Sequence, residues 1–392
     1  MHQAPTPLSP SPMQIVFLGL SITSSWGNGH ATTYRGLVRA LCRRGHQVLF
    51  LERETPWYRD HRDLAHPPYG RTCLYHSITE LRQRWSGAIR AADLVIIGSY
   101  VPEGIEVVSF VQRTARGLVA FYDIDTPVTL AAVAGGSCDY LAADLVPGFD
   151  LYLSFTGGPI LRRIEDDLGA RAARALYCSV DPDRHRPVAN NPRWDLGYLG
   201  TYSTDRQPTL DSLMCAPARA WPQGRFAVAG SLYPPDVAWP ANLERIEHID
   251  PGGHATFFAR QRFTLNVTRT DMIRSGYSPS VRLFEAAACG APIISDWWDG
   301  LDEFFCPGRE ILVAEGSDEV LRYLRELPED HRSDLARNAR ARVLASHTAD
   351  HRAATLETYV GEIHGAKRRP GRSAQQSGAS RIRASVAGAL PQ

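Results

Sequence analysis

The sequence predicts an α/β protein built from two Rossmann-like, doubly wound domains that face a cleft. Apolar segments of strand length alternate with helical segments through the first half of the chain. The alternation stops in a polar stretch that contains Pro and Asn, and then begins again. Strands of a parallel sheet are covered on both faces and therefore read as continuous apolar runs, and helices between them indicate crossover connections. The 392 residues suffice for two such domains.

The first domain is expected over residues 13–180. Its first strand, 14–20, is followed by a polar loop with two glycines, 24–30, and by a helix over 32–43 whose apolar residues share one side. Further strands are expected at 47–51, 94–98, 118–122 and 151–155, and helices at 104–116 and 158–168.

The second domain is expected over residues 193–346, after a linker at 181–192. No strand follows the last helical segment, 347–364, so we expect this helix to return to the first domain. Ligands of open α/β sheets bind beyond the carboxyl ends of the strands, which places the site in the interdomain cleft, and closure about the linker would exclude water. Strands are expected at 196–200, 225–230, 263–268, 292–295 and 310–313, and helices at 319–326 and 333–346.

Composition excludes several classes of function. No apolar run approaches the roughly 18–20 residues of a membrane span, so we expect no integral membrane contact. The tail, 365–392, carries a charge of +6 in a chain of +1, which leaves −5 for residues 1–364 and argues against a nucleic-acid-binding surface. This basic tail and the Pro- and Ser-rich leader, 1–12, are expected to be disordered. Seven scattered cysteines without a C-x-x-C pair indicate reduced thiols, a cytoplasmic protein and no zinc site.

The segment 275–296 is the most informative about function. Ser278 suits the N-cap of a helix, Pro279 suits its first position, and Gly290 supplies the left-handed residue that ends it. The loop before this helix would offer unpaired N–H groups and the positive end of the helix dipole. Such an arrangement is typical of a phosphate or diphosphate site.

Two side chains of the same helix fit a nucleoside diphosphate. Arg282 can fork onto a phosphate, and Glu285 on the same face can accept hydrogen bonds from two ribose hydroxyls. The alternative is structural, because Pro and Gly are ordinary helix punctuation and an Arg-x-x-Glu pair is often a solvated ion pair. The other expected donor-site residues of this segment are Gly276, Tyr277, Ser278 and Ser280.

Four further segments, together with 275–296, resemble the GT-B glycosyltransferases of group 1, and more closely their CgeB-like (spore-maturation) branch. They are 25–32 (SWGNGHAT), 121–127 (FYDIDTP), 153–159 (LSFTGGP) and 200–206 (GTYSTDR). The resemblance implies transfer of a sugar from a nucleoside diphosphate sugar to an acceptor hydroxyl on a glycan, a small molecule or a protein. It further implies retention of configuration, independence of metal ions and no cofactor besides the sugar nucleotide as co-substrate.

The resemblance has one departure. Enzymes of this group usually carry two acids, of which the downstream one matches Glu285. The upstream position is Tyr277 here. The upstream acid is associated with the hydroxyls of the donor sugar, so its replacement leaves the sugar and the stereochemistry open.

The loop after the first strand supplies candidates for the acceptor side. His30 stands at the start of a helix, where the dipole favours neutral imidazole, so it can act as a general base, bind substrate, or only cap the helix. Gly27 and Gly29 leave room for a ligand beside the backbone, although loop conformation alone could require them. Trp26 is also expected on the acceptor side. Trp57 and Tyr58 offer aromatic faces to a sugar there, although packing explains these two equally well.

Asp123 and Asp125 follow the strand 118–122. A D-x-D motif binds a metal–diphosphate in the other glycosyltransferase fold, but this one lies in the first domain, where a GT-B donor does not bind. We therefore expect acceptor binding, acid–base chemistry or loop positioning from these acids, and no metal site. The structural alternative is that they cap the helix that starts at Pro127.

Arg206 and Arg269 follow strands of the second domain. The resemblance implies that a basic residue in the first of these places neutralises the diphosphate leaving group, which is a large catalytic contribution. Either arginine could instead pair with a neighbouring acid, Asp205 or Asp271. His248 is expected beside the nucleobase, unless it belongs to the core.

Three other functions fit parts of the sequence. A nucleotide-sugar epimerase would share the fold and need no acceptor. Tyr277 in the place of the acid favours a non-catalytic protein that binds nucleotide sugars or takes part in coat assembly. A nicotinamide oxidoreductase has weaker support, because Gly27-x-Gly29 lacks the third glycine of a dinucleotide loop and only Glu52 ends the second strand as an acid.

Overall fold

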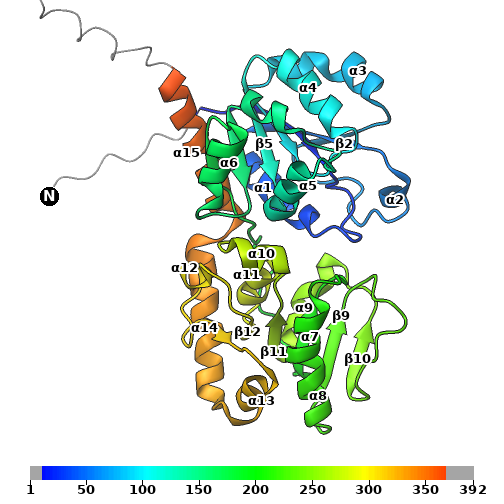
Figure 1. Cartoon of the computed structure of the whole chain (residues 1–392), viewed down its shortest axis with the longest axis vertical. Helices are drawn as coiled ribbons and strands as arrows, with labels where there is room; N and C mark the ends of the chain where they lie inside the picture. Colours follow the sequence, from blue (N-terminus) through cyan, green and yellow to red (C-terminus); the bar gives the residue numbers. More distant parts are fainter. Residues whose placement is uncertain (1–10, 368–392) are drawn as a thin grey trace, which may run out of the picture.

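The computed structural model describes residues 11–367, which form two lobes, each built around one sheet (Figure 1). The first sheet has the strand order β3-β2-β1-β4-β5-β6-β7, and the second has the order β10-β9-β8-β11-β12-β13. The strand pairings within both sheets are parallel. In each sheet the order reverses beside the first strand, which is the switch point of a doubly wound sheet. The predicted fold class is confirmed.

The first lobe contains the following elements. Its strands are β1 (Gln14–Gly19), β2 (Gln47–Arg53), β3 (Arg71–Tyr75), β4 (Leu94–Gly98), β5 (Leu118–Asp123), β6 (Leu151–Ser154) and β7 (Ala173–Ala175). Its helices are α1 (His30–Arg43), α2 (Pro56–Arg59), α3 (Ile78–Ala91), α4 (Gly104–Thr114), α5 (Thr126–Ala134) and α6 (Ile160–Leu168), with a 3-10 turn at Ala143–Gly148.

The second lobe follows the same plan, and most of its helices are short. Its strands are β8 (Trp194–Leu199), β9 (Phe226–Ala229), β10 (Leu243–Ile246), β11 (Gln261–Asn266), β12 (Ile293–Ser295) and β13 (Leu312–Val313). Its helices are α7 (Gln207–Leu210), α8 (Ala216–Ala220), α9 (His254–Ala259), α10 (Thr270–Ser275), α11 (Val281–Ala288), α12 (Leu301–Phe304), α13 (Ser317–Glu326) and α14 (Glu329–Ser346), and α15 (Ala349–Lys367) follows them.

Helices cover both faces of the first sheet, which explains its apolar strands. Ile15 and Phe17 of β1 face a core shared with α1 and α15, and Val16 and Leu18 face a second core shared with α3 and α4. Successive residues of a strand point to opposite faces, so a strand covered on both sides must be apolar throughout.

The last helix crosses from the second lobe to the first. Figure 1 shows α15 running from the end of α14 along the first lobe, and its residues Ala353 and Leu356 share a core with Leu37 of α1. Glu357 of α15 also lies 2.8 Å from the buried ring of His46, measured from Oε1 to Nε2. The chain therefore connects the lobes twice, through the proposed linker 181–192 and through the start of α15.

The helix expected from Pro279 begins two residues later, at Val281. Ser278 does not cap it, because the Ser278 hydroxyl lies 2.9 Å from the hydroxyl of Thr156 in the first lobe. Ser280 precedes the helix instead. The predicted segment is thus a loop held against the other lobe, followed by a shorter helix.

The predicted leader and basic tail lie almost wholly outside residues 11–367. Helix α15 continues to Lys367, beyond the end at 364 that the sequence indicated. Over the described part of the chain, no helix combines the length and the apolar character of a membrane span. All seven cysteines are free thiols.

Candidate active site

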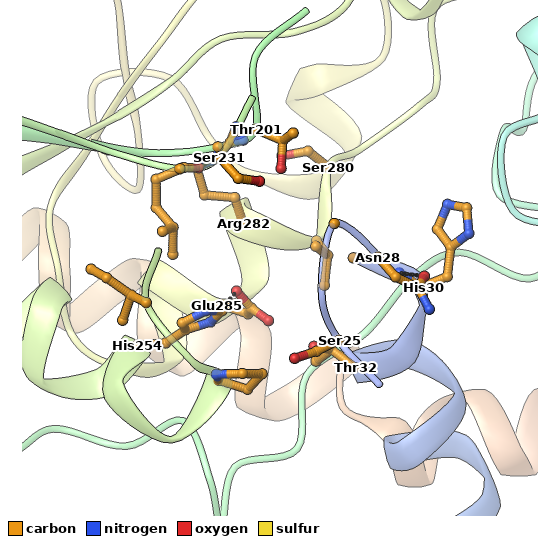
Figure 2. A pocket seen from close by; sticks show the side chains of 18 of the residues that line it. Ser25, Asn28, His30, Thr32, Thr201, Ser231, His254, Ser280, Arg282 and Glu285 are labelled. Carbon is orange, nitrogen blue, oxygen red and sulfur yellow. Dashed lines mark hydrogen bonds and ion pairs between the residues drawn. The ribbon is translucent and has the colours of Figure 1, made fainter. Parts of the chain in front are cut away.

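A cleft of about 380 Å³ lies between the two lobes, at the carboxyl ends of their strands. The first lobe contributes the loop between β1 and α1, and the second contributes the loops after β8, β9 and β11. Figure 2 shows His30 on one side of the cleft and Arg282 and Glu285 on the other. The predicted site residues that line it are Gly27, Gly29, His30, Asp125, Arg206, His248, Arg269, Ser280, Arg282 and Glu285.

The loop after β1 is held in place by Glu52, which is fully buried at the end of β2. Its carboxylate accepts hydrogen bonds from the hydroxyls of Ser21 (2.9 Å) and Thr23 (2.6 Å) and from the backbone N–H groups of Ile22 (2.8 Å) and Thr23 (3.0 Å). Both oxygens are therefore used within the loop. Glu52 is not free to bind a cofactor ribose, which removes the acid that favoured a nicotinamide enzyme.

His30 is the first residue of α1 and presents an imidazole to the cleft. Its ring stacks against Tyr100 with 5.7 Å between centroids, and its buried Nδ1 has no hydrogen-bond partner among residues 11–367. Burial lowers the pKa of His30 to about 4, a shift that Asp125 opposes and Arg269 assists. The neutral form expected from the helix start is thus favoured mainly by burial.

Asp123 lies in the interior of the first lobe and does not line the cleft. The Tyr152 hydroxyl donates to Asp123 Oδ2 at 2.6 Å, and the Thr129 hydroxyl donates to Oδ1 at 2.7 Å. Burial raises the pKa of Asp123 to about 6, although these hydrogen bonds oppose the shift. The catalytic role expected of Asp123 finds no support here, because this carboxylate braces the core while that of Asp125 faces the cleft.

Arg269 joins the two lobes. Its Nη1 lies 3.1 Å from Oδ2 of Asp125, an oxygen that also accepts a hydrogen bond from the Tyr100 hydroxyl at 2.8 Å. Its Nε lies 3.6 Å from Oδ2 of Asp205. Arg269 therefore pairs with Asp205, as expected if its role is structural. It also pairs with Asp125, which belongs to the other lobe.

Arg206 and Arg282 line the cleft and form no ion pair with a carboxylate of the described residues. Arg206 Nη2 donates to the carbonyl of Thr201 at 2.6 Å, and its buried Nε has no partner within residues 11–367. Arg282 Nη1 donates to Asn266 Oδ1 at 3.0 Å, and its guanidinium lies 4.6 Å from the ring centroid of Tyr198. Two guanidinium groups without a carboxylate partner in one cleft favour an anionic ligand.

Glu285 of α11 lies between two imidazoles at the floor of the cleft. Its Oε1 is 3.4 Å from His185 Nε2, and its Oε2 is 3.3 Å from His254 Nδ1. Burial opposes ionisation, but the two histidines and Arg282 prevail and hold the pKa of Glu285 below its usual value. Neither histidine is predicted from the sequence, because both are far from Glu285 in the chain and no local pattern marks them.

Gly276 and Tyr277 do not line the cleft, although a donor-binding role was expected of both. The ring of Tyr277 packs where a Cβ on Gly158 or Gly300 would lie only 2.4 Å or 2.6 Å from it. Gly276 has a left-handed φ of 65° and backs onto the carbonyl of Asp299, which leaves no room for a side chain. These residues brace the loop between the lobes.

A second cavity of about 150 Å³ adjoins the cleft and shares His30, Arg206 and Arg269 with it. Ser278 lines this cavity, whose remaining lining is largely apolar. The predicted donor-site residue Ser278 therefore lies beside the cleft and not within it.

The two predicted tryptophans do not line the cleft, but both lie beside the loop residues that do. Trp26 stacks on His61 with 4.4 Å between ring centroids, and its other neighbour is His248 of the second lobe at 4.7 Å. Trp57 is 53% exposed and stands beside Gly27, where an added Cβ would lie 3.9 Å from its ring. Trp57 is thus largely open to solvent, whereas one face of Trp26 is stacked on His61.

Comparison with known proteins supports the same fold. Residues 206–358, most of the second lobe and part of α15, match the family described as "Glycosyl transferase-like". No curated protein matches the sequence of the chain. The matched residues include Arg206, Arg269 and Glu285 of the cleft.

Three solved structures illustrate the likeness. Sucrose-phosphate synthase from Thermosynechococcus elongatus is 17% identical, with a TM-score of 0.64 over 90% of this chain and 100% of that one. Anabaena HepE in complex with UDP and glucose is 13% identical, with a TM-score of 0.65 over 89% and 100%. An alpha-glucosyltransferase in complex with UDP and a 13-mer DNA is 11% identical, with a TM-score of 0.63 over 90% and 100%. At these identities the likeness shows the GT-B fold.

Proposed function

We propose that this chain, with its GT-B fold and glycosyl transferase-like second lobe, transfers a sugar from a nucleoside diphosphate sugar to an acceptor hydroxyl. The observation that carries the proposal is the combination of a buried, ionised Glu285 with the guanidinium groups of Arg206 and Arg282 in one cleft. A carboxylate suits ribose hydroxyls and the guanidinium groups suit a diphosphate. Two of the three structural neighbours described above contain UDP, which fits the same class of donor.

The second lobe holds the leaving group in this proposal. Glu285 accepts hydrogen bonds from the ribose, and Arg206, Arg269 and Arg282 surround the diphosphate near Ser280 at the start of α11. When the bond between the anomeric carbon and the diphosphate oxygen breaks, the oxygen keeps the electron pair. Fixed positive charge at that point stabilises the transition state, so no metal ion is needed for this step.

The first lobe presents the acceptor. The neutral imidazole of His30 can accept a hydrogen bond or the proton from the acceptor hydroxyl as that oxygen bonds to the anomeric carbon. The exposed face of Trp57 is available to an acceptor sugar. Retention of configuration, metal independence and the CgeB-like branch are proposed on the sequence resemblance, and the acceptor is a glycan, a small molecule or a protein.

The test is to incubate the protein with UDP-, GDP-, dTDP- and CDP-sugars, with and without EDTA, and to measure release of nucleoside diphosphate and products by NMR. The proposal predicts release from one donor class, unaffected by EDTA, and a faster reaction when a mixture of acceptors is added. Conversion of the sugar without release would indicate an epimerase. Absence of both reactions would favour a non-catalytic binding protein.

A further inference from the structure

The carboxylate of Glu285 faces a buried histidine of the interdomain linker. His185 belongs to that linker and is 1% exposed, and Glu285 is 3% exposed. The nearest approach, from His185 Nε2 to Glu285 Oε1, is 3.4 Å, which is just beyond hydrogen-bond distance. A shift of a few tenths of an ångström would therefore make or break this bond.

The two ring nitrogens of His185 have no hydrogen-bond partner among residues 11–367. Burying an imidazole without partners costs free energy, so a ring in this place calls for a function. Burial lowers the pKa of His185, whereas the attraction of Glu285 outweighs burial and raises the pKa of His254. Glu285 thus lies between two imidazoles whose pKa values are shifted in opposite directions.

The linker that carries His185 is fastened to the first lobe. The backbone N–H of His185 donates to the carbonyl of Asp181 at 2.9 Å. The carboxylate of Asp181 pairs with Arg39 of α1 at 2.5 Å, and Asp183 pairs with Arg43 of α1 at 2.6 Å. The same helix α1 begins with His30 in the cleft, so one rigid element touches both the acceptor side and the linker.

We propose that His185 is a positioning residue that orients the Glu285 carboxylate for the nucleotide ribose and links this orientation to the seating of the linker on α1. With the linker held by Arg39, Nε2–H of His185 lies close enough to complete a hydrogen bond to Oε1 when the nucleotide binds. The remaining lone pairs of Glu285 are then directed at the two ribose hydroxyls. This inference rests on the proposed function, because it assumes that Glu285 binds ribose.

A metal ion is the main alternative occupant, since His185, His254 and Glu285 bring their ligand atoms within 4.8 Å of one another. The surroundings of His185 favour the positioning role over a metal site. A metal-ligating imidazole almost always donates its second N–H to another group, and His185 Nδ1 has no such partner within the described residues.

The experiment measures the dissociation constants of UDP, GDP, dTDP and CDP by calorimetry for the wild type and for variants of the linker. His185→Leu should weaken the nucleotide that binds by about tenfold, since a hydrogen bond to a charged group is lost. His185→Gln keeps a donor near the place of Nε2 and should remain within about threefold of the wild type. Arg186→Gln changes an exposed neighbour of His185 and is the matched control.

Double variants separate positioning from a loss of structure. In a Glu285→Gln background, His185→Leu should change the dissociation constant less than about twofold, because its partner is already altered. Arg39→Ala should weaken binding about two- to threefold in the wild type and have no effect beside His185→Leu. Wild-type affinity in His185→Leu, or an equal loss in the Glu285→Gln background, would overturn the inference.

Three further outcomes are decisive. If the wild type binds a nucleotide and Glu285→Gln does not, while His185→Leu binds normally, the proposed function stands and this inference fails. If the wild type binds none of the four nucleotides, both fail. Visible absorption from added Co²⁺ that disappears in His185→Leu would assign the cluster to a metal and would also overturn the positioning role.

Discussion

Arg269 in the second lobe and Asp125 in the first form an ion pair of 3.1 Å inside the candidate active site. The pair lies beside His30 and shares Asp125 with the hydroxyl of Tyr100. A diphosphate bound in the cleft would compete with Asp125 for this guanidinium. The contact between the lobes and the binding of the donor therefore depend on the same side chain.

The first prediction concerns this pair. Asp125→Asn should tighten the binding of a nucleoside diphosphate by a few-fold. The ion pair with Asp125, which contributes roughly 0.5–1 kcal/mol, then no longer competes with the diphosphate for Arg269. The same change should lower kcat by about tenfold or more, since the acid beside His30 is lost. Calorimetry and steady-state rates measure the two effects. Weaker nucleotide binding in Asp125→Asn would contradict this description of the pair.

The second prediction separates the two acids of the D-x-D motif. Asp123 has a pKa of about 6 in the fold against 3.8 for the free group, so the native state binds its proton more tightly. Its contribution to the free energy of unfolding is therefore present below pH 3.8 and is lost as pH rises to about 6.

Asp123→Asn should remove that pH dependence, which chemical denaturation at several pH values can measure. Activity should stay within about threefold of the wild type, because the residue does not reach the cleft. A collapse of kcat in a folded Asp123→Asn protein would show that Asp123 takes part in the reaction. Asp125→Asn serves as the matched comparison.

The third prediction tests the arginines. Arg206→Gln and Arg282→Gln should each lower kcat/KM by about 100-fold, the scale of a lost interaction with the charged transition state. Arg225→Gln is the control, because Arg225 is 58% exposed and stands at the opposite end of the sheet, before β9. Equal losses in all three variants would indicate a general effect on the fold, and wild-type rates in Arg206→Gln would remove it from the site.

The fourth prediction concerns pH. The pKa of His30 is lowered from 6.5 to about 4, so the free enzyme should keep the neutral imidazole down to about pH 4. If His30 is the general base, the acidic limb of kcat/KM should have its midpoint near 4 and should disappear in His30→Gln. A midpoint near 6.5 in the wild type would contradict a buried, neutral His30.

His30 also makes the free energy of unfolding depend on pH, in the direction opposite to that of Asp123. Because the folded pKa of His30 lies below the unfolded value, the unfolded chain takes up this proton first as pH falls. The contribution of His30 to the free energy of unfolding is therefore complete above pH 6.5 and decreases toward pH 4. His30→Gln should be less sensitive to acid over that range.

The sequence predicted the central strands because burial on both faces makes them apolar, as in β1, β4 and β5. It missed the edge strand β3, whose residues are mostly half-buried and include Arg71. It also missed α3, although Ser77 and Glu80 give the pattern of a capping box, and the structure shows Ser77 Oγ accepting from the Glu80 N–H at 3.1 Å.

The candidate site was predictable where strand ends carry polar residues, because the doubly wound fold places those ends together. Arg206 after β8 and Arg269 after β11 line one cleft for that reason, and Glu285 joins them from α11. The two histidines beside Glu285 depend on the path of the linker and of the loop before α9, which no periodic pattern encodes. The Tyr277 ring lies away from the cleft because it packs against Gly158 of the other lobe, which the local sequence does not indicate.

The central claim is that Glu285 and the arginines of the cleft bind a nucleoside diphosphate. Calorimetric titration of UDP, GDP, dTDP and CDP into the wild type, Glu285→Ala and the exposed control Glu326→Ala, each with and without EDTA, tests it most directly. We predict micromolar binding of one nucleotide to the wild type and the control, unaffected by EDTA, and a loss of at least about tenfold in Glu285→Ala. Equal affinity in Glu285→Ala, or no binding to the wild type, would contradict the claim.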